Sequence, residues 1–147
     1  MVDYFENNHL FMKKCKENEC ILKNASRDYY IVDEDSLKNN ICAEDKSVDC
    51  ILINKKPVNS LFNLIFCELG NNKSYKDIKE KASKSGKHMC GILEKYGINI
   101  NKIYCFHLGS IKNLHSKQRK PITICSASNV RIESKSCQFD FDELNLN

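Results

Sequence analysis

The sequence predicts a single domain of the α+β or α/β class, with a mixed central β-sheet and flanking helices. Its 147 residues are 41% hydrophobic, which suits one globular domain with a real core. Two nearly continuous apolar segments, 48–54 and 61–69, are typical of central strands covered on both faces. A long amphipathic helix follows them. We assign residues 1–147 to one domain, with a core at about 20–133 and a loosely held tail at 138–147.

The N-terminal third is expected to contain a short helix and two short strands. Apolar residues between Tyr4 and Lys16 fit a helix, and the strands are expected at 20–22 and 29–32, around the polar turn 23–28. The acidic stretch 33–36 interrupts the pattern and is expected to cap a turn. Segments 48–54 and 61–69, joined by a turn around Pro57, then form a hairpin.

The clearest element is a helix over 74–96. Ser74 and Asp77 have the spacing of a capping box, and apolar or small residues recur in alternating steps of three and four. Gly97 suits the C-terminal cap. A strand over 98–108, a basic segment over 109–120, and strands at 122–125 and 130–132 complete the predicted order.

The charges are unevenly distributed. The net charge is +4, but residues 71–120 hold 12 Lys or Arg against 3 Asp or Glu, whereas the rest of the chain holds 11 against 16. A basic segment of this size suits a polyanion such as DNA or RNA, although a Lys-rich helix also serves simply as a solvated surface.

The nine cysteines are expected to be buried, reduced thiols. Their number is odd, most have apolar neighbours, and the N-terminus lacks the basic and apolar parts of a signal peptide, so we expect a cytoplasmic, intracellular protein. Cys15 and Cys20 have ligand-like spacing, and His9 and Cys42 could complete a set of four. Because no second close pair exists, we do not expect a structural zinc site.

The predicted central hairpin contains two acidic residues. Asp49 lies near the start of its first strand and Glu68 near the end of its second. In an antiparallel hairpin these two positions meet at the same end of the sheet. Two carboxylates there can hold Mg²⁺, which activates water and stabilises charge on a phosphate, whereas the plain alternative is that both acids mark solvent-facing strand ends.

At these residues the sequence resembles the PD-(D/E)xK nuclease superfamily, which has the restriction-endonuclease-like fold. The family pattern places an Asp on one strand and Glu-x-Lys on the next, followed by a helix and a further strand. Residues 48–53, 65–69, 74–96 and 101–107 match that order. The resemblance implies that Asp49 and Glu68 are catalytic residues that ligate Mg²⁺.

One position departs from the family pattern. Gly70 stands where the family has its catalytic Lys, so Lys73 or Lys76 is expected to supply the ammonium group. The departure equally fits a member that has kept binding and lost cleavage. Glu34 and Glu44 are candidates for an acid that many members carry upstream.

The first expectation is thus a small nuclease-like protein that binds nucleic acid, most simply DNA, and hydrolyses phosphodiesters as a Mg²⁺-dependent endonuclease. The alternative is an inactive member of the fold that acts as a nucleic-acid or protein binding module. Under both hypotheses we expect a homodimer and no membrane-spanning segment. The phosphate-contacting residues are expected to be Lys79, Lys84, Lys87, Lys117, Arg119 and Lys120.

Overall fold

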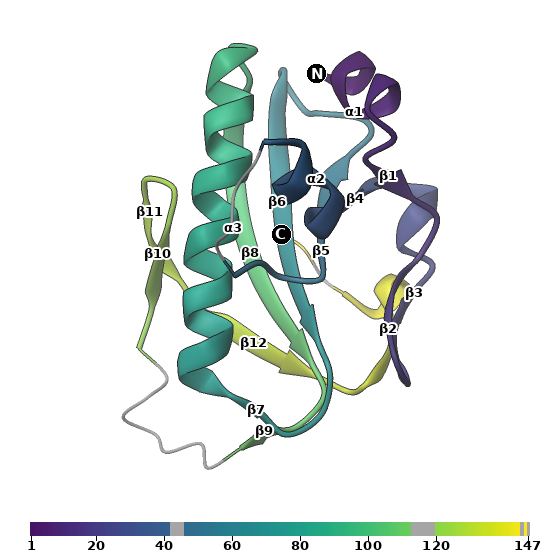
Figure 1. The fold of residues 1–147 in the computed structure, drawn as a ribbon, viewed down its shortest axis with the longest axis vertical. Helices are drawn as coiled ribbons and strands as arrows, with labels where there is room; N and C mark the ends of the chain where they lie inside the picture. Colours follow the sequence, from purple (N-terminus) through teal and green to yellow (C-terminus); the bar gives the residue numbers. More distant parts are fainter. Residues whose placement is uncertain (42–45, 113–119, 145, 147) are drawn as a thin grey trace.

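The protein, described by a computed structural model over residues 1–41, 46–112, 120–144 and 146, is an α+β structure built on a mixed six-stranded sheet (Figure 1). The strand order is β1-β4-β5-β6-β8-β12. The sheet is antiparallel from β1 to β6 and parallel from β6 to β12. These strands are β1 (Phe11–Met12), β4 (Tyr29–Asp33), β5 (Cys50–Asn54), β6 (Leu61–Leu69), β8 (Asn99–Leu108) and β12 (Ile132–Lys135).

Each face of the sheet carries its own apolar core. On one face, Phe66 and Ile51 pack with residues of α3 (Tyr75–Lys95), α1 (Val2–Asn7) and α2 (Glu34–Asn40). On the other, Ile65 and Leu52 pack against a small sheet of β2 (Cys15–Glu17), β3 (Cys20–Lys23) and β13 (Gln138–Asp140). Burial on both faces explains why β5 and β6 are nearly continuous apolar runs.

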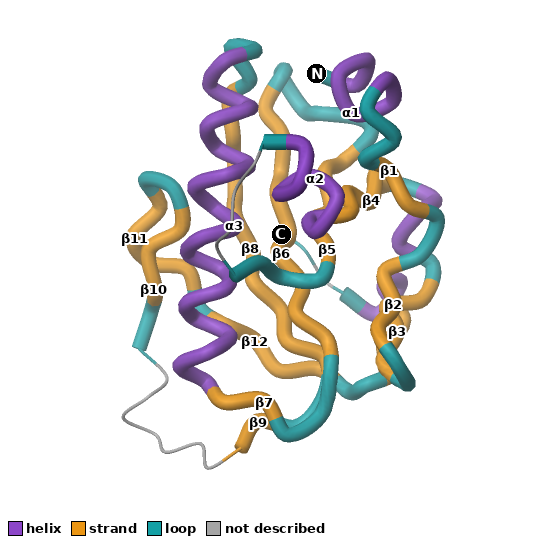
Figure 2. Tube along the Cα trace, viewed as in Figure 1, coloured by secondary structure: helices purple, strands orange, loops and turns teal. Residues whose placement is uncertain are grey.

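Helix α3 begins and ends as the sequence predicts. The Ser74 hydroxyl accepts a hydrogen bond from the Asp77 backbone N–H, and Gly97 follows the helix with a φ of 65°. Figure 2 shows α3 running alongside β8, with the hairpin of β10 (Ile122–Ile124) and β11 (Ala127–Val130) at its side. At this contact a side chain on Gly86 would overlap Ile124. The connection β6–α3–β8 joins two parallel neighbours, as a crossover helix does.

The N-terminal segment differs from the predicted helix. Helix α1 ends at Asn7, and residues 11–12 form β1, where Phe11 pairs with Val32. His9, with a φ of 54°, lies between them and stops the helix. Pairing with the sheet therefore overrides the weak helical pattern, a tertiary effect that local spacing does not contain.

The C-terminal segment is more firmly held than the sequence suggests. Beyond Cys137, β13 pairs with β3, and Phe141, in a short 3₁₀ helix (Phe141–Glu143), is buried against Tyr29 with ring centroids 4.9 Å apart. The core thus extends outside 20–133 at both ends, since Phe5 and Leu10 are also buried.

The expectation of reduced thiols throughout is corrected by three disulfides. They join Cys15 to Cys50, Cys20 to Cys137 and Cys90 to Cys125, while Cys67 and Cys105 are free and buried. Cysteines 15 and 20 have different partners, so they form no shared zinc site; Cys42 lies outside the described residues. The sequence could not reveal this because pairings depend on which strands meet in space.

No helix in the described part of the chain is both long enough and apolar enough to cross a membrane.

Candidate active site

The hairpin register brings Asp49 and Glu68 together. Cys50 pairs with Cys67 across β5 and β6, which places the preceding Asp49 opposite the following Glu68. The Asp49 backbone N–H donates to the Cys67 carbonyl at 3.1 Å, continuing the ladder. The Leu69 backbone N–H donates to Asp49 Oδ2 at 2.7 Å, so this carboxylate is fixed by the strand that carries Glu68.

Both acids lie on the face of the sheet that α3 covers. Side chains alternate along a strand, so Glu68 lies on the same face as Phe66, and Asp49 lies on the same face as Ile51. Phe66 and Ile51 both pack on the α3 side of the sheet. Glu68 is fully buried, and its Oε1 has no hydrogen-bond partner among the described residues. A buried carboxylate oxygen without a donor is costly, and either a proton on the neighbouring carboxyl or a bound cation offsets that cost.

Lys81 of α3 supplies a positive charge to the pair. Its Nζ lies 2.5 Å from Glu68 Oε2 and 3.4 Å from Asp77 Oδ2, and the side chain is 19% exposed. Burial would lower the pKa of Lys81, but the contacts with Glu68 and Asp77 outweigh it and leave the pKa raised. Lys81 is therefore a charged group at neutral pH.

The electrostatics of Asp49 reflect its crowded position. Burial, and next the neighbouring Glu68 carboxyl, raise the pKa of Asp49 to about 7, although the Leu69 N–H and Lys81 oppose the change. Two carboxyl groups confined together resist ionising together, and a bound cation relieves that repulsion. Asp49 and Glu68 thus fit Mg²⁺, which takes one or two carboxylates and keeps several waters.

The thiols beside the acids are not nucleophiles. Burial raises the pKa of Cys105 to about 12 and that of Cys67 well above its ordinary value, so both remain protonated near neutrality. Cys105 and His107 share one face of β8, but a protonated, buried thiol does not attack.

The structure explains the glycine at position 70. Gly70 has a φ of 127°, a backbone conformation that residues with a side chain rarely adopt, so a lysine at this position would be strained. Of the lysines predicted to replace it, Lys73 lies over Gly70 and Lys76 is exposed on α3. Within the described part of the chain, neither lysine forms a hydrogen bond or ion pair with the acids. Lys81, which the sequence did not single out, contacts Glu68 directly.

The predicted phosphate-contacting residues lie on several sides. Positions 77, 81, 84 and 88 share one flank of α3, at 100° per residue, so Lys84 is on the flank of Lys81. Lys79 and Lys87 are exposed on other flanks, and Lys120 is exposed before β10. Lys46, on the loop before β5, pairs with Asp77 at 2.9 Å. Lys117 and Arg119 lie outside the described residues.

The candidate upstream acid Glu34 belongs to a separate buried group. Glu34 Oε1 lies 2.8 Å from His88 Nδ1, and burial is the main cause that raises the pKa of Glu34 to about 8. Ser85 also hydrogen-bonds to Glu34, and its hydroxyl accepts from the Val48 backbone N–H at 2.8 Å. This buried group therefore holds the backbone of Val48, the residue before Asp49, in place. Glu44 lies outside the described residues.

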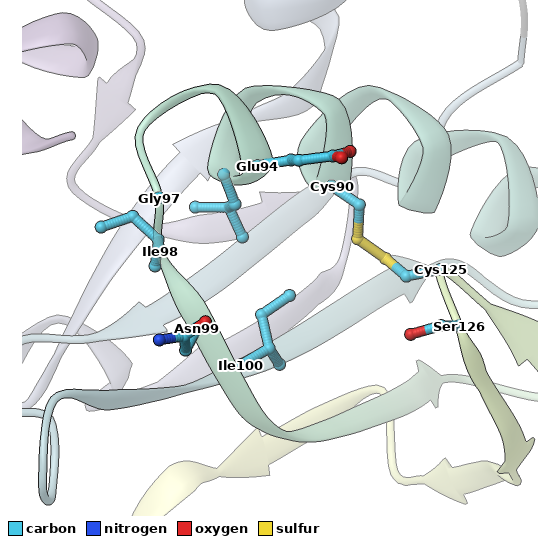
Figure 3. A pocket seen from close by; sticks show the side chains of 9 residues that line it. Cys90, Glu94, Gly97, Ile98, Asn99, Ile100, Cys125 and Ser126 are labelled. Atoms are coloured by element: carbon cyan, nitrogen blue, oxygen red, sulfur yellow. A yellow bond between two sulfur atoms is a disulfide. The ribbon is translucent and has the colours of Figure 1, made fainter.

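A pocket elsewhere in the molecule is distinct from the acid pair. It lies between the C-terminal end of α3, the start of β8 and the β10–β11 hairpin, and the Cys90–Cys125 disulfide forms part of its wall (Figure 3). Its apolar lining includes Leu93, Ile98 and Ile100. The acids lie at the opposite end of β6 and β8, so this pocket contributes nothing to their chemistry.

Comparison of the chain with protein-family models, with curated proteins and with solved structures finds no match in any of the three.

Proposed function

We propose that the protein is a metal-dependent nuclease-like protein that binds nucleic acid, most simply DNA, and hydrolyses phosphodiester bonds. The observation that carries the proposal is the meeting of Asp49 and Glu68 on adjoining strands with the Lys81 ammonium against Glu68. Two carboxylates can hold a divalent cation and a lysine can stabilise negative charge on a phosphate, and both tasks serve metal-assisted phosphodiester hydrolysis.

The order of elements supports a restriction-endonuclease-like arrangement. An Asp strand, an antiparallel Glu strand, a helix and a strand parallel to the second follow one another as β5, β6, α3 and β8. The lysine comes from α3 instead of the Glu strand, which the backbone at Gly70 explains.

In the proposed reaction each group has one task. Asp49 and Glu68 would hold Mg²⁺, which when bound would activate a water and neutralise phosphate charge. The Leu69 N–H keeps Asp49 oriented. Lys81 stabilises the negative charge that grows on the phosphate. As the water oxygen bonds to phosphorus, it would release one proton to solvent. The ester bond to the leaving oxygen would break, and that oxygen would take up one proton from solvent.

The test is nicking of supercoiled plasmid with Mg²⁺ by purified protein. We expect nicking that EDTA stops and that Asp49→Asn and Glu68→Gln each abolish. Lys81→Met is expected to reduce it at least about a hundredfold, the cost typical of one preorganised charge-stabilising group. Glu94→Gln and Lys95→Met, at the far end of the same helix, are the matched controls. Nicking that persists in Asp49→Asn refutes the site.

A non-catalytic binding module is the second candidate. Gly70 in place of lysine favours it, as does the neutralisation of Lys81 by two acids, Glu68 and Asp77. This candidate predicts salt-sensitive retention of DNA in a mobility-shift assay, with no nicking by the wild-type protein. Weakening of that retention by Lys84→Gln, but not by Lys95→Gln, would locate the binding face beside Lys81.

A further inference from the structure

His107 of β8 stands next to Glu68 and takes no part in the reaction described above. The parallel register of β6 and β8 pairs Glu68 with His107 directly. His107 lies two residues after Cys105, which packs on the α3 side, so its side chain shares the face of Glu68 and Asp49. The imidazole is fully buried.

The hydrogen bond of His107 fixes its tautomer. Nε2 lies 2.7 Å from the Gly70 carbonyl oxygen, which can only accept, so Nε2 carries the hydrogen. Nδ1 then presents a lone pair in the neutral ring. This atom is buried and has no hydrogen-bond partner among the described residues. A backbone carbonyl that accepts one ring N–H while the other ring nitrogen stays unpartnered is the arrangement that metal-ligating histidines show.

We propose that His107 Nδ1 is the third protein ligand of the metal site formed by Asp49 and Glu68, and that the site therefore prefers a first-row transition-metal ion to Mg²⁺. The proposal rests on the proposed function for the two carboxylates. Imidazole favours transition ions, whereas Mg²⁺ favours oxygen ligands alone. Gly70 gains a second role, because its carbonyl orients the ring that would bind the ion.

The ion must draw these ligands together. Among the described residues, every group of three potential ligands whose atoms lie within 4.8 Å of one another includes cysteine. The ligand atoms of Asp49, Glu68 and His107 are therefore farther apart than this in this structure. Glu68 is currently held by Lys81, and Asp49 by the Leu69 N–H. Binding a cation removes the repulsion between the two carboxylates and allows the site to contract.

The test is calorimetric titration of the oxidised protein, residues 1–147, with Co²⁺ and, separately, with Mg²⁺, in the absence of nucleic acid. The visible spectrum of bound Co²⁺ reports its ligands. The main variant is His107→Gln, whose side-chain amide can still donate to the Gly70 carbonyl while Nδ1 is removed. His107→Asn is the second variant, His9→Gln, which alters an exposed histidine, is the control, and thermal melting confirms folding.

We expect one Co²⁺ per chain, bound at least about tenfold more tightly than Mg²⁺. We expect His107→Gln to weaken Co²⁺ binding at least about tenfold, to change the Co²⁺ spectrum, and to leave Mg²⁺ binding within about twofold. If both affinities and the spectrum are unchanged while Asp49→Asn abolishes binding, His107 is a structural histidine only and the inference fails alone. If Asp49→Asn leaves metal binding intact, the acid pair is not the metal site and the proposed function fails with it.

Discussion

The buried Glu34 makes a sharp prediction about stability and pH. Burial raises the pKa of Glu34 from 4.5 to about 8, so the folded state holds a proton there that the unfolded chain releases at lower pH. The stabilisation that the protonated Glu34 carboxyl contributes is therefore complete below pH 4.5 and is lost as the pH rises through 8. Between pH 7 and pH 9 the loss amounts to about 1.4 kcal/mol, at 1.36 kcal/mol for each pKa unit.

The comparison with Glu34→Gln over one pH interval isolates this carboxyl, because pH-dependent contributions shared by the two proteins cancel. The assay is urea denaturation followed by circular dichroism at pH 7 and pH 9, under oxidising conditions. From pH 7 to pH 9, the free energy of unfolding should fall by about 1.4 kcal/mol more for the wild-type protein than for Glu34→Gln, because glutamine does not titrate.

The control and the refuting result are equally definite. Glu80→Gln, which removes a more exposed acid on α3, should follow the wild-type pH dependence. Parallel pH dependences of Glu34→Gln and wild type, or a gain of wild-type stability towards pH 9, would show that Glu34 is ionised in an ion pair with His88 and that the reasoning from burial is mistaken.

The remaining predictions concern the charges and crosslinks of the structure. Lys81→Met should lower the free energy of unfolding in urea by about 3–5 kcal/mol, because Glu68 is then buried with no cation. Adding Glu68→Gln should restore most of that free energy. Equal stability of the single and double variants would contradict this expectation. The Cys20–Cys137 disulfide closes a loop with a sequence separation of 117, so Cys20→Ser should lower the free energy of unfolding by about 2–5 kcal/mol, and mass mapping should find Cys137 as the released thiol. Gly86→Val should destabilise the contact between α3 and β10 by about 1–3 kcal/mol, whereas Gly91→Ala, where nothing lies within 4 Å, should not destabilise the protein.

The central hairpin and helix were within reach of the sequence because their signals are local. The apolar runs of β5 and β6 and the cap at Ser74 were predicted at their observed places. The meeting of Asp49 and Glu68 follows from antiparallel pairing alone, since the start of one strand must face the end of the next.

The lysine required a fact that the sequence does not contain. Lys81 reaches Glu68 because α3 docks with that flank toward β5 and β6, and docking depends on packing of the whole helix. One signal could have pointed to it: Lys81 follows Asp77 by four residues and lies beside the buried stripe of Ile78, Ala82 and Ser85. Strand alternation places His107 on the face of Cys105, but its neighbour Glu68 appears only in the register of β6 and β8.

The disulfides and the small sheet lay beyond sequence reasoning for the same reason. Cys20 and Cys137 meet only because β13 returns to pair with β3. Strands as short as three or four residues carry too little periodicity to be recognised without their partners.

The most direct measurement of the central claim is anomalous diffraction from crystals soaked with Mn²⁺, which stands in for the catalytic ion. We expect one strong anomalous peak in contact with both Asp49 and Glu68, on the face covered by α3, and no such peak in crystals of Asp49→Asn. Manganese bound only at other residues, with the two carboxylates still contacting Lys81 and the Leu69 N–H alone, would contradict it.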